Sequence, residues 1–211
     1  MVVASEFVCS RLAMVLGLPV PAGGLVTGAE ESVAPGGLAY VSLNFYPEGE
    51  RPPPADPERL EGRQWDMAGL AVFDAWIACQ DRHLRNIVFE PDLGVPLTVI
   101  DFDQSMPSHL DLGMGVGQLV RYRPGDLLRE PHELITAAQP VKEWIDRVMS
   151  LPRHTVEGIV GQAVNAAAMP ADVGEQVAYV LVERGEALPT LFKEDWEAGR
   201  ILTRIDEWGL V

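Results

Sequence analysis

Two stretches of this sequence, DRHLRNIVF at residues 81–89 and VIDFDQS at residues 99–105, give the strongest indication of its fold. The residues before them, 65–79 (WDMAGLAVFDAWIAC), are apolar on nearly all sides, which predicts a buried helix. Residues 86–90 and 97–102 have the composition of short strands and are separated by a turn containing Pro and Gly. The sequence therefore predicts a helix, a polar loop and a β-hairpin in immediate succession.

Three polar residues, Asp81, Asn86 and Asp101, lie in this loop and at the end of the second predicted strand. Phosphoryl transfer from a nucleotide requires a carboxylate that orients or deprotonates the acceptor hydroxyl, and an amide and a second carboxylate that hold Mg²⁺ against the phosphates. In protein kinases the catalytic Asp precedes the metal-binding Asn by five positions, and a hairpin leads to the metal-binding Asp. Asp81 and Asn86 have this offset. Residue types, spacing and element order together favour a phosphotransfer site.

These stretches resemble the DRHxxN and IDF motifs of phosphoinositide kinases and of the HipA-like bacterial kinases. Residues 5–21, SEFVCSRLAMVLGLPVP, are similar to the HipA-like helix that carries the αC glutamate and ends in an LGLPVP-type exit. The resemblance spans residues 5–105, is strongest over residues 74–105 and is weak in the C-terminal helices. It implies an α+β, protein-kinase-like fold with a mostly helical C-lobe, a catalytic-loop β-hairpin and a reduced N-terminal lobe.

Carried over by motif position, the resemblance implies a role for each matching residue. Asp81 is the expected catalytic carboxylate, and Asn86 and Asp101 are the expected Mg²⁺ ligands that bind the ATP phosphates. Glu6 matches the glutamate that pairs with the nucleotide-positioning lysine. His83 matches the motif histidine, for which a supporting catalytic role at the phosphates is expected. The implied cofactors are ATP and Mg²⁺.

Simpler interpretations of the same residues stand beside these roles. Asp81 and Asn86 also suit a polar loop in which they cap and turn the chain. Asp103 replaces the glycine of the usual DFG and is either a further carboxylate at the metal or an ordinary turn residue. Glu6 also suits the first turn of a helix after an N-cap at Ser5, where the helix dipole favours an acid.

The sequence departs from the family pattern at its N-terminal side. The families place a phosphate-covering loop and a β-strand lysine before the glutamate helix, but only five residues precede Glu6 here and the chain's two lysines are Lys142 and Lys193. The glycines 113, 115 and 117 follow the predicted metal-binding Asp, which suits an activation segment or a flexible loop. Three explanations are open: a small lobe on another polypeptide, a pseudokinase, or a chain that starts at an internal methionine.

The expected organisation has three parts. Residues 1–50 form a truncated N-lobe remnant, with a helix over 5–16 and a hinge strand over 38–46. Residues 51–64 form a stiff linker that begins inside the proline-rich stretch EGERPPPADP (residues 48–57). Residues 65–211 form the helical C-lobe. Within this C-lobe the patterns predict further helices over 141–151, 155–168, 171–186 and 196–208.

The composition of the chain indicates which classes of binding partner and which cellular compartment to expect. The chain has 16 basic and 31 acidic residues, a net charge of −15, which disfavours nucleic acids and anionic membrane surfaces as partners. Its two cysteines, Cys9 and Cys79, lie in apolar helical patterns and form no bridge framework, which favours a cytoplasmic protein. We find no stretch of 18 uninterrupted apolar residues, so no membrane span is expected.

The leading hypothesis is an ATP- and Mg²⁺-dependent phosphotransferase acting on a hydroxyl of a protein or small molecule, with a small-lobe partner protein as one source of the missing lysine. The alternative from another class is a pseudokinase, or a nucleotide- or protein-binding module without catalysis. A third hypothesis, a Mg²⁺-dependent phosphoesterase, rests only on the short DxD at Asp101–Asp103.

Overall fold

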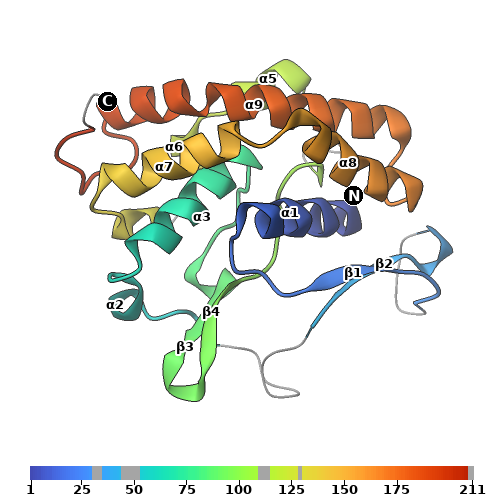
Figure 1. Cartoon of the computed structure of the whole chain (residues 1–211), viewed down its shortest axis with the longest axis horizontal. Helices are drawn as coiled ribbons and strands as arrows, with labels where there is room; N and C mark the ends of the chain where they lie inside the picture. Colours follow the sequence, from blue (N-terminus) through green and yellow to red (C-terminus); the bar gives the residue numbers. More distant parts are fainter. Residues whose placement is uncertain (30–34, 44–52, 109–114, 128–129, 209–211) are drawn as a thin grey trace.

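The computed structural model describes residues 1–29, 35–43, 53–108, 115–127 and 130–208. The fold is α+β: it is mostly helical, with two small antiparallel sheets of two strands each within the described residues. Figure 1 shows the long helix α9 (Ala171–Glu197) lying across a layer of helices, with both hairpins on the opposite side of the molecule. This layer includes α1 (Val2–Leu16), α3 (Gln64–Trp76), α7 (Ala138–Met149) and α8 (Arg153–Asn165).

Helix α1 confirms the predicted N-terminal helix and begins earlier, at Val2. Gly17 ends it in a left-handed conformation with φ 82°, which glycine adopts without steric cost. The extended exit that follows reaches the second hairpin, because Val99 donates its backbone N–H to the carbonyl oxygen of Pro19 at 2.7 Å. Helix α1 is therefore joined to the strand that leads to Asp101.

Helix α3 confirms the predicted buried helix, and every residue from Met67 to Trp76 is buried. It packs against α7 and α9, which cover it from the C-terminal half of the chain. The buried apolar residues of α1, α3, α7, α8 and α9 form one continuous core. The loop and hairpin of residues 81–101 therefore follow a helix whose position is fixed by packing on several sides.

Helix α9 differs from the prediction. We expected a helix over 171–186 and another over 196–208, but α9 continues through Pro189 to Glu197, and residues 198–208 form turns. Proline inside a helix removes one hydrogen bond and usually ends the helix. Here Leu188, Leu191 and Phe192 are buried against the core around it, so packing outweighs the local preference.

Three of the four strands in the two hairpins confirm predicted strands, at shifted bounds. Strands β1 (Gly23–Val26) and β2 (Ala39–Ser42) pair with each other, while residues 44–46 of the predicted hinge strand lie outside the described residues. Strands β3 (Ile87–Glu90) and β4 (Val95–Val99) pair with Ile87 opposite Val99. Between them is the short 3₁₀ helix η3 (Pro91–Leu93).

The described part of the predicted linker, residues 53–64, contains the short helix α2 (Pro57–Leu60) and is not a loop throughout. Asp56 caps α2, because its side chain accepts the N–H of Glu58 at 3.0 Å, and Pro57 suits the first helical position. Leu60 is buried in the same core. The division of the chain at 51–64 into two lobes stays a prediction.

Between the hairpin and α7 the described residues hold short elements only. These are α5 (Val116–Val120), α6 (Pro124–Leu127) and the 3₁₀ helix η4 (Glu130–Leu134), while Gly113 of the predicted activation segment lies outside the described residues. None of the helices in the described ranges is long and apolar enough to cross a bilayer.

Candidate functional site

The polar loop after α3 brings Asp81 and His83 into direct contact. His83 Nε2 lies 2.6 Å from Asp81 Oδ1, and each side chain is about half exposed, 45% for His83 and 50% for Asp81. A carboxylate that bonds one imidazole nitrogen fixes the orientation of the ring and leaves its other nitrogen for another partner. The two residues predicted to be catalytic therefore form one solvent-accessible pair.

Asn86 ends the 3₁₀ helix η2 (Leu84–Asn86) and closes the same loop. Its side-chain Nδ2 donates to the backbone carbonyl oxygen of Asp81 at 2.9 Å. Its backbone carbonyl oxygen accepts the N–H of Ile100 at 3.0 Å. The first bond uses the amide nitrogen, so the Asn86 side-chain oxygen stays available as a ligand. The second bond holds the loop beside the residue that precedes Asp101.

Asp101 follows the end of β4 in a left-handed conformation with φ 64°. This conformation is strained for most side chains, is tolerated best by Asn and Asp among them, and occurs often at functional sites. The residue contacts solvent, yet partial burial of its carboxyl group and the neighbouring Asp103 raise its pKa. Asp103 donates its backbone N–H to Asp101 Oδ1 at 3.4 Å, so the two predicted metal-binding carboxylates are neighbours.

A buried ion pair between Arg82 and Asp74, which we did not predict from the sequence, lies beneath the polar loop. Arg82, 1% exposed, donates to both carboxylate oxygens of Asp74 on α3, with Nε 3.0 Å from Oδ2. Burial alone raises the pKa of Asp74, but the three hydrogen bonds from Arg82 favour its charged form, and we take the pair as ionised. An acid in the apolar, buried part of α3, eight residues before an arginine, was the signal.

Arg82 also fixes the backbone at Asp101. Its Nη1 donates to the carbonyl oxygen of Ile100 at 2.7 Å and to that of Asp101 at 3.3 Å. All three guanidinium nitrogens of the buried Arg82 thus bond to the protein interior, which favours a structural role over that of a phosphate ligand. The loop, α3 and the residue after β4 form one hydrogen-bonded unit.

Glu6 lies on α1 and faces the residue after Asp101. Its Oε1 accepts the backbone N–H of Phe102 at 3.0 Å. Burial, opposed in part by this hydrogen bond and reinforced by Asp101 and Asp103, raises the pKa of Glu6 to about 7. No lysine or arginine of the described residues forms an ion pair with Glu6. The structure therefore places Glu6 beside the site without the cation expected for it.

Two further contacts join α1 to the segment after Asp101. Ser5 Oγ donates to the carbonyl oxygen of Ser105 at 3.1 Å and lies 2.7 Å from Ser108 Oγ. The buried Cys9 donates its thiol to the carbonyl oxygen of Met106 at 3.3 Å. Helix α1 is therefore held against residues 102–108 along its N-terminal half, and this fixes the position of Glu6.

The predicted metal ligands Asn86, Asp101 and Asp103 carry oxygen atoms of the kind that Mg²⁺ binds. Within the described residues, no group of three or more His, Cys, Asp or Glu side chains is arranged to hold a metal ion alone. Mg²⁺ usually binds through one or two carboxylates together with water and substrate phosphates. Asp101 and Asp103 are neighbours through the 3.4 Å contact between the Asp103 N–H and Asp101 Oδ1, and a metal site that they share with Asn86 stays a prediction.

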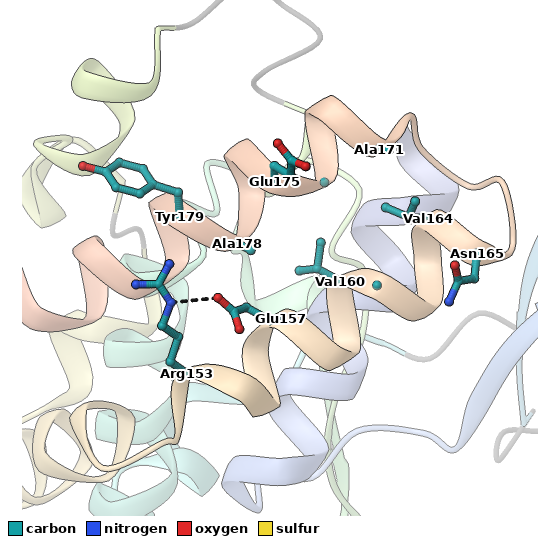
Figure 2. Close-up of a pocket in the computed structure, with 11 residues that line it drawn as sticks. Arg153, Glu157, Val160, Val164, Asn165, Ala171, Glu175, Ala178 and Tyr179 are labelled. Atoms are coloured by element: carbon teal, nitrogen blue, oxygen red, sulfur yellow. Dashed lines mark hydrogen bonds and ion pairs between the residues drawn. The ribbon is translucent and has the colours of Figure 1, made fainter.

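Two cavities of similar size lie in different parts of the molecule. One, about 450 Å³, is lined by Pro54, His83, Leu84, Arg85 and Glu130 and thus adjoins the Asp81–His83 pair. The other, about 420 Å³, is a groove between α8 and the first turns of α9, where Figure 2 shows Arg153 paired with Glu157. This groove contains none of the predicted site residues, whereas His83 lines the first cavity.

Comparisons of the whole chain with protein-family models, with curated proteins and with solved structures found no match.

Proposed function

We propose that this chain is the acceptor-side part of a HipA-like, kinase-like phosphotransferase that uses ATP and Mg²⁺. The observation that carries the proposal is the hydrogen-bonded unit that joins Asp81, Asn86 and the backbone of Ile100 ahead of Asp101. Kinase-like chemistry needs a carboxylate at the acceptor and an amide and a carboxylate at the metal, held in fixed relation. Asp81, Asn86 and Asp101 would supply those groups.

Each residue of the unit then has a distinct task. Asp101 and Asn86 would hold Mg²⁺, which supplies charge neutralisation at the phosphates. Partial burial and the neighbouring Asp103 raise the pKa of Asp101, and a cation would stabilise the charged form of both carboxylates. Asp81 would orient the acceptor hydroxyl, either directly or through His83, which bonds it at 2.6 Å. Arg82 would keep the position of Asp101 fixed from the protein interior.

A lysine-bearing small lobe is the part that the proposal requires from elsewhere. Lys142 lies over the ring of Trp208 and Lys193 lies near Glu197 on α9, so neither is close to Glu6. The face of α1 and the β1–β2 hairpin expose large apolar side chains, as a surface for such a lobe would. They are Val2, Met14, Val15, Val26, Val41 and Leu43.

A non-catalytic binding module is the second candidate, and a specific observation favours it. Glu6 forms no ion pair with any described lysine or arginine, and burial raises its pKa to about 7, so its charge is only partly formed near neutral pH. A site without the phosphate-positioning cation would bind a nucleotide through Mg²⁺ and transfer nothing.

Calorimetry of Mg²⁺·ATP binding, run beside an assay of ADP release, separates the two candidates. The phosphotransferase predicts binding and turnover, for this chain alone or with a co-encoded small-lobe protein, and Asp81→Asn should abolish turnover while nucleotide binding persists. The exposed Asp146→Asn on α7 is the matched control and should change neither. Binding with no turnover under either condition supports the binding module. Absence of nucleotide binding under both conditions contradicts both candidates.

A further inference from the structure

The cavity beside the Asp81–His83 pair is built on the same backbone that positions the proposed site. Ala55 donates its N–H to the carbonyl oxygen of Leu84 at 3.0 Å, which holds the chain next to Pro54 against the loop. His83 belongs both to the cavity wall and to the pair with Asp81. A ligand in this cavity therefore lies next to the proposed acceptor-orienting carboxylate.

Arg85 is the positive charge of this cavity, and no described residue neutralises it. It is exposed and makes no hydrogen bond or ion pair with the described part of the chain. In a chain with 31 acidic and 16 basic residues, most of the described arginines form an ion pair with a carboxylate, as Arg59, Arg63, Arg153 and Arg204 do. An uncompensated arginine that lines a cavity is suited to an anionic group of a ligand.

Glu130 is the negative charge of the same cavity. Its Oε2 accepts the backbone N–H of Leu84 at 3.2 Å, which fixes the carboxylate and leaves its other oxygen available. Although Arg85 and Glu130 line one cavity, they form no ion pair with each other. Two opposite charges are thus kept apart in one concave space, an arrangement that suits a ligand carrying both signs of charge.

We propose that this cavity binds the phosphoacceptor, and that the acceptor is a small hydroxylated zwitterion of the amino-acid type. Its carboxylate meets Arg85, its ammonium group meets Glu130, and its hydroxyl faces His83 and Asp81. The volume of about 450 Å³ lies within the range of small-molecule sites, roughly 300–1,000 Å³. A ligand with no net charge also avoids repulsion by a protein of net charge −15.

This inference rests on the proposed function, and the transfer it implies is balanced. The acceptor oxygen forms a bond to the γ-phosphorus of ATP while the bond from that phosphorus to the bridging oxygen of ADP breaks. The hydroxyl proton passes to the Asp81–His83 pair and then to solvent. The products are ADP and the phosphate ester of the hydroxylated amino acid, and no oxidation or reduction takes place.

Nuclear magnetic resonance of the ¹⁵N-labelled full chain tests the cavity without requiring turnover. The reporters are the backbone amides of Leu84 and Arg85, because Leu84 bonds Glu130 and Arg85 carries the proposed anion contact. L-serine, L-threonine and L-homoserine are the zwitterionic probes. Glycolate lacks the ammonium group, ethanolamine lacks the carboxylate and glycerol lacks both. We expect saturable shifts at both amides with at least one zwitterionic probe, and dissociation constants roughly tenfold higher for the other three compounds.

Two variants assign the binding to the cavity. Arg85→Gln should raise the dissociation constant of the bound amino acid roughly fivefold, as expected for the loss of one partly exposed charge contact. Arg121→Gln is the matched control, because Arg121 is also exposed and its side chain also makes no hydrogen bond or ion pair with the described residues. It should leave the constant unchanged.

Titration of Mg²⁺ together with a non-hydrolysable ATP analogue into the same sample, followed at the Phe102 amide, tests the phosphotransferase proposal separately from the amino-acid cavity. Amino-acid binding without nucleotide binding keeps the cavity assignment and contradicts the phosphotransferase. Nucleotide binding without binding of any of the three amino acids overturns the acceptor assignment alone. Equal affinity for charged and neutral probes, equal effects of Arg85→Gln and Arg121→Gln, or preference for a hydroxylated peptide over the free amino acids would also overturn it.

Discussion

At the scale of single residues, the site depends on a buried charge pair that never meets solvent. Arg82 links Asp74 on α3 to the backbone carbonyls of Ile100 and Asp101. Such a pair contributes little net stability relative to apolar residues, but removal of one partner leaves an uncompensated buried charge. Its main effect here is positional, because it fixes Asp101 in its left-handed conformation.

Asp74→Asn tests this role. The substitution leaves the Arg82 guanidinium buried without a carboxylate, and we expect the free energy of unfolding to fall by about 3–5 kcal/mol. Urea denaturation followed by circular dichroism measures the change, with Asp146→Asn as a surface control expected to stay within about 0.5 kcal/mol. A loss for Asp74→Asn as small as that of the control would show that the pair is not buried as described.

Glu6 makes stability depend on pH. Its pKa in the folded chain is raised to about 7, whereas the unfolded chain has an ordinary glutamate pKa of about 4.3. Between these values the unfolded chain has lost the proton and the folded chain keeps it, so stability falls as pH rises through this window, by an amount on the order of 2 kcal/mol.

The comparison with Glu6→Gln isolates that contribution from the general self-repulsion of an acidic chain. Glutamine can still accept the N–H of Phe102 but does not ionise. Urea denaturation at several pH values between 4.5 and 8 should give a flatter dependence for the variant than for the natural chain. Parallel curves for the two proteins would contradict the buried, protonated Glu6.

At the scale of elements, close helix packing positions the loop. Gly69 on α3 faces Trp144 of α7, and a Cβ atom at this position would lie 2.4 Å from Trp144 Cε2. Trp144 is 1% exposed and donates its indole N–H to the carbonyl oxygen of Trp65 at 2.9 Å, so it cannot move aside freely. The close approach of α3 and α7 therefore requires glycine.

Gly69→Ala should lower the free energy of unfolding by about 1–3 kcal/mol, because overpacking outweighs the better helix propensity of alanine. Gly158→Ala on α8 is the matched control. A Cβ there meets no atom within 4 Å, and we expect it to raise stability by about 0.5–1 kcal/mol. Thermal and urea denaturation give both values, and a stabilising Gly69→Ala would refute the packing of α3 on α7.

The elements nearest the site were also the most predictable from sequence. The apolar run of α3 and the strand–turn–strand pattern after it depend on local composition, so their existence and order were correct. The continuation of α9 through Pro189 was not predictable, because it depends on contacts with residues far away in the chain. The Asp74–Arg82 pair was missed for the same reason: its partners meet only after the helix ends and the loop turns back.

At the scale of the whole molecule, one core formed by α1, α3 and α7–α9 supports the two hairpins, which lie on the side of the molecule opposite α9 (Figure 1). The sequence pattern and the family resemblance proposed these residues for a site, and that assignment stays a prediction. The structure brings Asp81, His83 and Asn86 into hydrogen-bonded contact, with Glu6 and Asp103 beside the turn at Asp101. The cavity with Arg85 and Glu130 was not predicted, because Glu130 comes from a region with no clear sequence pattern.

The measurement that tests the proposed metal site most directly is paramagnetic broadening by Mn²⁺ together with a non-hydrolysable ATP analogue. In ¹⁵N spectra of the full chain, we predict broadening of the amide signals of Phe102 and Ile87, and no effect on α8 signals such as that of Gly161. Asp101→Asn should remove the broadening, and Asp146→Asn should retain it. Broadening that persists in Asp101→Asn, that is centred elsewhere, or that is absent from the natural chain would contradict a metal–nucleotide site at Asn86 and Asp101.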